Sequence, residues 1–169
     1  MVTLLDLFSE NDQVKKWHQS LTDKKRQLIL GLSTSTKALA IASSLEKEDK
    51  VVLLTSTYGE AEGLVSDLIS ILGEELVYPF LVDDSPMVEF FMSSQEKIIS
   101  RVEALRFLTD SSKKGILVCN IAASRLILPS PTRFKESTIK IAVGEEYDQH
   151  ELLHRLKEIG YRKVTQVQT

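Results

Sequence analysis

An eight-residue stretch of this chain has the spacing of a phosphate-binding loop. Residues 31–38 read GLSTSTKA. The phosphate-binding pattern is G-x-x-x-x-G-K-[ST], in which backbone N–H groups and a lysine hold phosphates and a hydroxyl holds Mg²⁺. Gly31 and Lys37 occupy the positions of the first glycine and the lysine. Thr36 occupies the position of the second glycine, and Ala38 that of the hydroxyl residue.

Both replacements remove chemistry from the loop. A β-branched threonine resists the positive φ with which glycine turns its N–H toward a phosphate. An alanine has no hydroxyl for Mg²⁺. We therefore predict a degenerate nucleotide-binding loop, although any strand–turn–helix can carry a glycine and a lysine, and the eight residues alone favour that coincidence. The residues of the predicted loop are Gly31, Ser33, Thr34, Ser35, Thr36, Lys37 and Ala38.

A second stretch matches a catalytic motif. Residues 150–154 read HELLH and fit H-E-x-x-H, the zinc-protease pattern. A helical wheel places the leucines of this helix on one face and both histidines nearly opposite, toward solvent, whereas a catalytic zinc needs an enclosed pocket. Lys157 also stands where the extended motif has a glycine. We interpret the match as a coincidence and predict no metal site and no catalytic residues in this chain.

Composition is that of an ordinary soluble globular protein. The chain has 169 residues, 43% of them hydrophobic and 27% charged, and a net charge of −3, which gives no global attraction to DNA or to a membrane surface. Its single cysteine, Cys119, lies in the apolar run GILVCN and is expected to be a buried small hydrophobe. No run approaches the roughly 18 apolar residues of a membrane helix, and the first residues lack a signal-peptide pattern. We expect a cytoplasmic protein that makes no membrane contact.

The elements that must position the loop alternate between strands and helices. Alternation of this kind predicts an α/β fold with a parallel sheet and flanking helices. Strands are predicted at 27–30, 51–55, 76–80 and 115–119. Helices are predicted at 3–8, 11–18, 37–45, 60–72 and 121–128, with a long helix that is capped by Ser93 or Ser94 and reaches Leu108. On the long helix, the residues expected to face inward are Ile98, Ile99, Val102, Leu105 and Leu108.

The alternation breaks at residues 129–131, which read PSP. This run predicts a boundary between a first domain at 1–128 and a second domain at 129–169. The second domain is expected to hold one strand at 139–143 and one helix at 149–159 that Gly160 closes. One strand and one helix cannot bury a core, so we expect the start of a smaller α+β domain that is incomplete in this chain.

The order of these pieces resembles a known family. Residues 27–45 and 51–68 are similar to the first strand, P-loop, helix and second strand–helix of the excision-repair protein UvrB. They are more similar still to the N-terminal, UvrB-like region of the transcription-repair coupling factor (Mfd) family. Further similar runs are YPF, SSQEKIISRVEAL, GILVCNIAASRLILP and GEEYDQHELLHRLKEIGYRKVTQV. The resemblance covers nearly the whole chain, and its last run is the most specific to the family.

Two departures distinguish the chain from UvrB. UvrB carries an intact P-loop, whereas Thr34 and Thr36 replace glycines here and Ala38 replaces a threonine. The long aromatic hairpin with which UvrB clamps DNA has no counterpart in the short stretch from Leu81 to Ser93. The resemblance thus implies a fragment of the Mfd family, with a first domain like domain 1a of UvrB and the first part of a UvrA-binding domain.

The resemblance also implies a function in transcription-coupled nucleotide excision repair. In this family an ATP- and Mg²⁺-dependent DNA translocase displaces a stalled RNA polymerase, and the UvrB-like module recruits UvrA. The motor lies elsewhere in the parent chain, so this segment is expected to be a non-catalytic platform without a cofactor. The implied UvrA contacts are Arg162 first, then Tyr161 and Lys163, although Arg162 is equally well interpreted as an ordinary exposed residue after a helix. Enzyme activity of the segment stays open, because the alternative is a nucleotide-binding or ATPase domain that works through Lys37.

Overall fold

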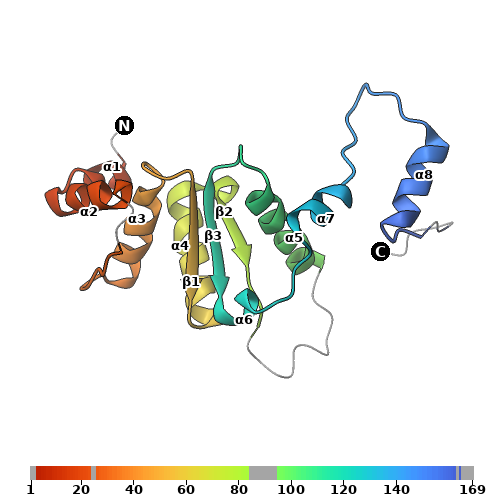
Figure 1. Ribbon diagram of the computed structural model, residues 1–169. Coiled ribbons are helices and arrows are strands. Elements are labelled where there is room, and N and C mark those ends of the chain that lie inside the picture. The colour runs from red at the N-terminus through yellow and green to blue at the C-terminus, as the bar shows by residue number, and fades with distance from the viewer. Residues whose placement is uncertain (1–2, 24–25, 84–94, 163, 165–169) are drawn as a thin grey trace. The chain divides into compact units, whose positions relative to one another are not determined.

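The computed structural model describes residues 3–23, 26–83, 95–162 and 164 (Figure 1). The chain divides into two compact units, Met1–Ile127 and Leu128–Thr169. Within the described ranges, no helix is both long enough and apolar enough to cross a bilayer.

A three-stranded parallel sheet forms the centre of the first unit. Its strands are β1 (Lys50–Thr55), β2 (Val77–Phe80) and β3 (Gly115–Asn120), in the order β1-β3-β2. Both pairings are parallel. All residues of β3 are buried, as the apolar run GILVCN predicts for a central strand. The α/β fold with a parallel sheet and flanking helices is therefore confirmed.

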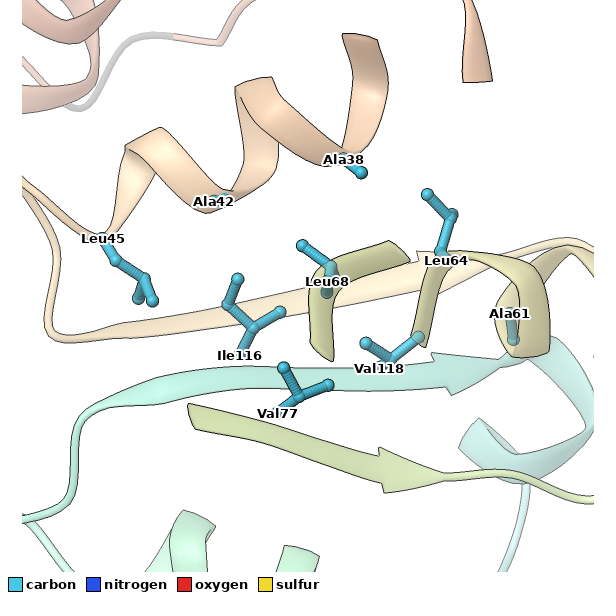
Figure 2. Close-up of a cluster of buried hydrophobic side chains, with 9 residues drawn as sticks. All are labelled: Ala38, Ala42, Leu45, Ala61, Leu64, Leu68, Val77, Ile116 and Val118. Atoms are coloured by element: carbon cyan, nitrogen blue, oxygen red, sulfur yellow. The ribbon is translucent and has the colours of Figure 1, made fainter. Parts of the chain in front are cut away.

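Two helices cover one face of the sheet. They are α3 (Thr34–Ser44) and α4 (Tyr58–Leu72), and α4 is the amphipathic helix that the sequence predicts. Their apolar side chains meet those of β2 and β3 in a buried cluster (Figure 2). The members of this cluster are Ala38, Ala42, Leu45, Ala61, Leu64, Leu68, Val77, Ile116 and Val118. The cluster fixes the start of α3, and with it the end of the predicted phosphate-binding loop.

The opposite face of the sheet is covered over β2 and β3. Helices α5 (Gln95–Thr109) and α6 (Ile121–Ser124) pack there on a second buried cluster. Cys119 belongs to this cluster, and its burial raises the pKa of its thiol. The other members are Phe80, Ala104, Phe107, Leu117 and Ala123. Burial of Cys119 in the apolar strand is thus confirmed.

The face that α5 buries differs from the predicted one. Ala104 and Phe107 are fully buried. By contrast, four residues expected to face inward are 40–61% exposed: Ile98, Ile99, Val102 and Leu108. The expected inward face of the long helix was therefore wrong for these four residues, whereas the fifth, Leu105, packs against the second cluster as expected. The helix carries apolar residues around most of its circumference, so their spacing did not define one buried stripe. The predicted caps, Ser93 and Ser94, lie outside the described residues.

Two short helices precede the sheet. They are α1 (Leu4–Ser9) and α2 (Asp12–Thr22), and α1 packs beside α3. Thr3 caps α1 in a reciprocal capping box with Asp6, whose pKa is lowered by the backbone and side-chain hydrogen bonds to Thr3. Both helices agree with the sequence prediction within a few residues.

The strand predicted at 27–30 is wrong. Residues 26–30 adopt no regular structure, and Leu28 and Leu30 are 83% and 79% exposed. In the described structure β1 pairs only with β3, so its outer edge has no neighbouring strand. An apolar run forms a strand only where its backbone can pair with a neighbouring strand. The run at 27–30 pairs with none of the described strands.

The second unit contains two described helices. They are α7 (Pro131–Glu136) and α8 (Gln149–Glu158). The strand predicted at 139–143 was wrong, since this segment adopts no regular structure and Val143 is fully exposed. Gly160 has a φ of +100° directly after the C-cap of α8, as a glycine that closes a helix should.

Candidate functional site

The predicted phosphate-binding loop connects residues 26–30 to α3. Gly31 has a φ of +82°, the left-handed conformation that glycine adopts without strain. Ser33 is the N-cap of α3, so the helix begins within the loop, three residues before the predicted start at Lys37. The middle of the loop is thus the first turn of a helix.

The hydroxyls of the loop bond to each other. Ser33 Oγ and Thr36 Oγ1 lie 2.7 Å apart, and the Ser33 side chain makes no capping bond to the helix. Thr34 and Ser35 are exposed in the first turn of α3. The first N–H groups of a helix have no partner within the helix, so this turn retains donors for an anion.

Lys37 lies beside an acidic residue of the same chain. Its Nζ lies 3.8 Å from Oε1 of Glu60, which belongs to the first turn of α4. Ser56 Oγ donates a hydrogen bond of 2.9 Å to Oε2 of the same carboxylate. Lys37 and Glu60 are 48% and 40% exposed, so the pair contributes little stability. Its importance is electrostatic, because a carboxylate beside Lys37 opposes the approach of a phosphate.

Ala38 belongs to the hydrophobic core. Its side chain is fully buried in the cluster between α3, α4 and the sheet, and it lies near Leu64 in Figure 2. A hydroxyl at this position would enter a densely packed apolar cluster, where a polar group without a partner costs free energy. The position that holds a Mg²⁺-binding hydroxyl in the pattern therefore has a packing role here.

The central strand also lacks an acidic residue at its carboxyl end. β3 ends at Asn120, which is fully buried. Its Nδ2 donates to the backbone oxygen of Val82 at 2.7 Å, and its Oδ1 accepts from the backbone N–H of Val82 at 3.1 Å. This pair of bonds holds the chain that leaves β2. Asn120 was not among the predicted site residues, and its only signal in the sequence was a polar residue at the end of an apolar run.

The HELLH helix presents its histidines to solvent. His150 and His154 are exposed on α8, and His154 Nδ1 lies 3.5 Å from Glu158 one turn further on. Leu152, Leu153 and Leu156 are half-buried, which is the arrangement that the helical wheel predicts. Across the described residues, no group of three or more His, Cys, Asp or Glu side chains is placed to hold a metal ion.

The predicted partner contacts follow α8 in the second unit. Tyr161 is 66% exposed and donates its backbone N–H to the Leu156 oxygen at 2.9 Å. Arg162 is exposed, and Lys163 lies outside the described residues. An exposed arginine shortly after a helix is available to a partner, but neither its exposure nor its position identifies that partner.

These features define an α/β module whose parallel sheet is followed by a small helical unit. No protein-family model matches the chain. It is 30% identical over 161 residues to a transcription-repair-coupling factor of Staphylococcus haemolyticus. The identity is 28% over 165 residues for the factor of Bacillus subtilis and 26% over 164 residues for that of a bovine strain of Staphylococcus aureus.

The similarity covers this chain far more completely than it covers the relatives. The alignments include 93–96% of the chain and 14% of each relative. The chain is therefore homologous to a segment of transcription-repair-coupling factors, and it spans about 14% of the length of the curated relatives it matches.

Proposed function

We propose that the chain belongs to the N-terminal region of a transcription-repair coupling factor and recruits UvrA as a non-catalytic platform. The observation that supports this proposal most strongly is the similarity to factors of that name along 93–96% of the chain. In the proposal, the parent protein is an ATP- and Mg²⁺-dependent DNA translocase that displaces stalled RNA polymerase during transcription-coupled repair. The motor lies outside residues 1–169.

The geometry of the loop is consistent with a platform rather than an ATPase. Glu60 stands beside Lys37, and Ala38 is packed in the core. Phosphoryl transfer depends on positioned charges and on a bound Mg²⁺ ion. The carboxylate of Glu60 opposes the first requirement, and the absence of a hydroxyl at Ala38 opposes the second. In a protein whose motor lies elsewhere, this loop is free to serve as the connection that starts α3.

Arg162 is the proposed centre of the UvrA contact, with Tyr161 and Lys163 beside it. A guanidinium is planar and binds a carboxylate with two parallel hydrogen bonds, which suits an interface. We expect Arg162→Glu to weaken binding of purified UvrA at least roughly tenfold, about 1.4 kcal/mol, in a surface-binding assay. Arg133→Glu on α7 is the matched control, because Arg133 is also exposed in the second unit, and it should leave the affinity unchanged.

Two results would contradict this assignment at different levels. If Arg162→Glu binds UvrA as tightly as the unchanged chain, the residue assignment is wrong although recruitment stands. If the unchanged chain shows no saturable binding to UvrA, the recruitment proposal itself fails.

The alternative is a nucleotide-binding or ATPase domain that uses the loop through Lys37. The positive φ of Gly31 and the free first turn of α3 favour it. We expect no saturable binding when the chain is titrated with fluorescent ATP and Mg²⁺. The comparison variant carries Thr34→Gly, Thr36→Gly and Ala38→Thr, which restore the motif. Saturable binding by the natural sequence that is lost in Lys37→Ala would instead establish the alternative.

A further inference from the structure

We propose that a hollow at the outer edge of β2, between α4 and α5, docks a short basic peptide segment of a partner protein. The peptide places an apolar side chain in the hollow and a lysine or arginine beside Glu74 and Glu75. The proposal concerns the first unit and does not rest on the UvrA contact proposed above, which lies in the second unit. Its basis is the shape of the hollow, its apolar floor and the charges at its rim.

The hollow has the size of a ligand-binding site. Its volume is about 510 Å³, and ligand pockets commonly have volumes of about 300–1,000 Å³. α4 and α5 pack on opposite faces of the sheet and β2 is its edge strand, so the hollow runs round this edge (Figure 1). Pro79 and Ser100 also line a second hollow of about 250 Å³, so the two adjoin as one elongated groove. An elongated groove fits an extended chain better than it fits a compact molecule.

The floor of the hollow is apolar. Ile69 of α4 and Val77 of β2 line it on one face of the sheet, and Tyr78 and the α5 residue Ile99 line it on the other. Ile99 is 61% exposed, because α5 packs a different side of its circumference against the sheet. An apolar side chain that enters the hollow removes this aliphatic surface from water, which favours binding.

The edge of β2 does not favour pairing with a further strand. Pro79 has no backbone N–H to donate, and a proline within a sheet belongs at such an edge. The N–H of Val77 already donates to the backbone oxygen of Glu74. A peptide laid along β2 therefore receives no hydrogen bond from either of these residues. Its side chains, rather than a backbone ladder, must provide most of the binding.

The rim of the hollow is acidic. Its charged residues are Glu74, Glu75, Glu103 and Lys113. Glu103 already pairs with Arg106 at 2.8 Å and with Lys113 at 3.6 Å. Glu74 and Glu75 are exposed in the turn before β2, and no basic side chain of the described residues forms an ion pair with either. Two carboxylates thus remain for a ligand of opposite charge.

One cation of the chain already lies over the floor of the hollow. Lys113 Nζ is 5.3 Å from the centroid of the Tyr78 ring, in addition to its pairing with Glu103. The second hollow is lined by two glutamates and two basic residues, so it has no net preference for either sign of charge. Selection for positive charge therefore takes place beside Glu74 and Glu75. The same two carboxylates oppose binding of nucleic acid or an anionic membrane.

A phage-displayed library of random short peptides tests the proposal. The unchanged chain is the bait, and peptides that also bind the triple variant Glu74→Lys, Glu75→Lys and Ile99→Ser are discarded. This subtraction leaves peptides that need the hollow. We expect them to combine lysine or arginine with an adjacent aliphatic or aromatic residue. If no peptide remains, or if the remaining peptides are acidic or uncharged, the proposal is wrong.

The contribution of the rim is measured with one selected peptide, synthesised with a fluorescent label. Glu74→Lys with Glu75→Lys should weaken its binding at least about tenfold, and added salt should weaken its binding to the unchanged chain. Glu145→Lys with Glu146→Lys is the matched control, because it makes the same change in charge at two exposed glutamates of the second unit. An equal loss of affinity in the control would show a general effect of net charge and would overturn the assignment to the hollow.

The contribution of the floor is measured with the same peptide. Ile99→Ser should weaken binding about tenfold, because it removes the aliphatic surface that the ligand covers. Ile98→Ser is the control: Ile98 is 50% exposed on the same helix but lines neither hollow, so the affinity should not change. Unchanged binding in Ile99→Ser would contradict the proposal. So would displacement of the peptide by an equal concentration of free arginine amide, because the hollow would then bind a cation and not a peptide.

Discussion

Among the described glycines, Gly115 is the one at which an added side chain would meet other atoms. A Cβ built there would lie 2.6 Å from the backbone oxygen of Leu76 and 2.8 Å from the Tyr78 ring, and the φ of Gly115 is +149°. A side chain would therefore strain the backbone and push β3 away from the chain that enters β2. Because β3 is the central strand, the disturbance would reach both of its neighbours.

We expect Gly115→Ala to lower the free energy of unfolding by about 1–3 kcal/mol, measured by urea denaturation with circular dichroism. Gly63→Ala on α4 is the control. An added Cβ meets nothing within 4 Å there, and alanine favours the helix, so stability should rise by about 0.5–1 kcal/mol. Equal stability of Gly115→Ala and the unchanged chain would show that β3 can shift at no cost.

At the scale of elements, regular apolar spacing determined which predictions held. α4 was predicted within two residues at its start and to the residue at its end, because one stripe of small and aliphatic side chains meets the sheet. On α5 the apolar residues surround the helix, so the buried face depended on the small Ala104 and the large Phe107 that fit β2 and β3. Packing of this kind cannot be obtained from spacing.

The two strand predictions that were wrong failed for a different reason. Residues 27–30 and 139–143 have the composition of strands, but a strand also requires a neighbour to pair with. The same dependence on distant residues hid part of the candidate site. A helix after the loop followed from the sequence, although its start was placed three residues too late. The acidic neighbour of Lys37, Glu60, depended on how α3 packs against α4.

Among the described residues of the first unit, none covers the face of β1 that carries Val52 and Leu54. In the parallel register Val52 lies beside Leu117 and Leu54 beside Cys119, so each pair shares one face of the sheet. Leu117 and Cys119 are buried, yet Val52 and Leu54 are 60% and 56% exposed. Parallel sheets are normally covered on both faces, and an apolar strand with a free edge promotes association.

We expect the chain to bind a dye specific for apolar surface and to associate as its concentration rises. The double variant Val52→Lys and Leu54→Lys should reduce both effects, measured by dye fluorescence and analytical ultracentrifugation, because charges on an edge strand oppose pairing. Leu4→Lys, at a residue that is 67% exposed on α1, is the matched control and should change neither. If association persists in the double variant, the surface through which the chains associate is not the exposed face of β1.

The burial of Ala38 also bears on how reversible the state of the loop is. A threonine at this position adds a methyl group and a hydroxyl to a site that is already fully enclosed, and overpacking of a core costs about 1–3 kcal/mol. A chain that regains the metal-binding hydroxyl must therefore accept a weaker core at once, before the other loop positions can make the hydroxyl useful. The cost in folding stability therefore opposes any substitution that would bring this loop closer to the nucleotide-binding motif it resembles.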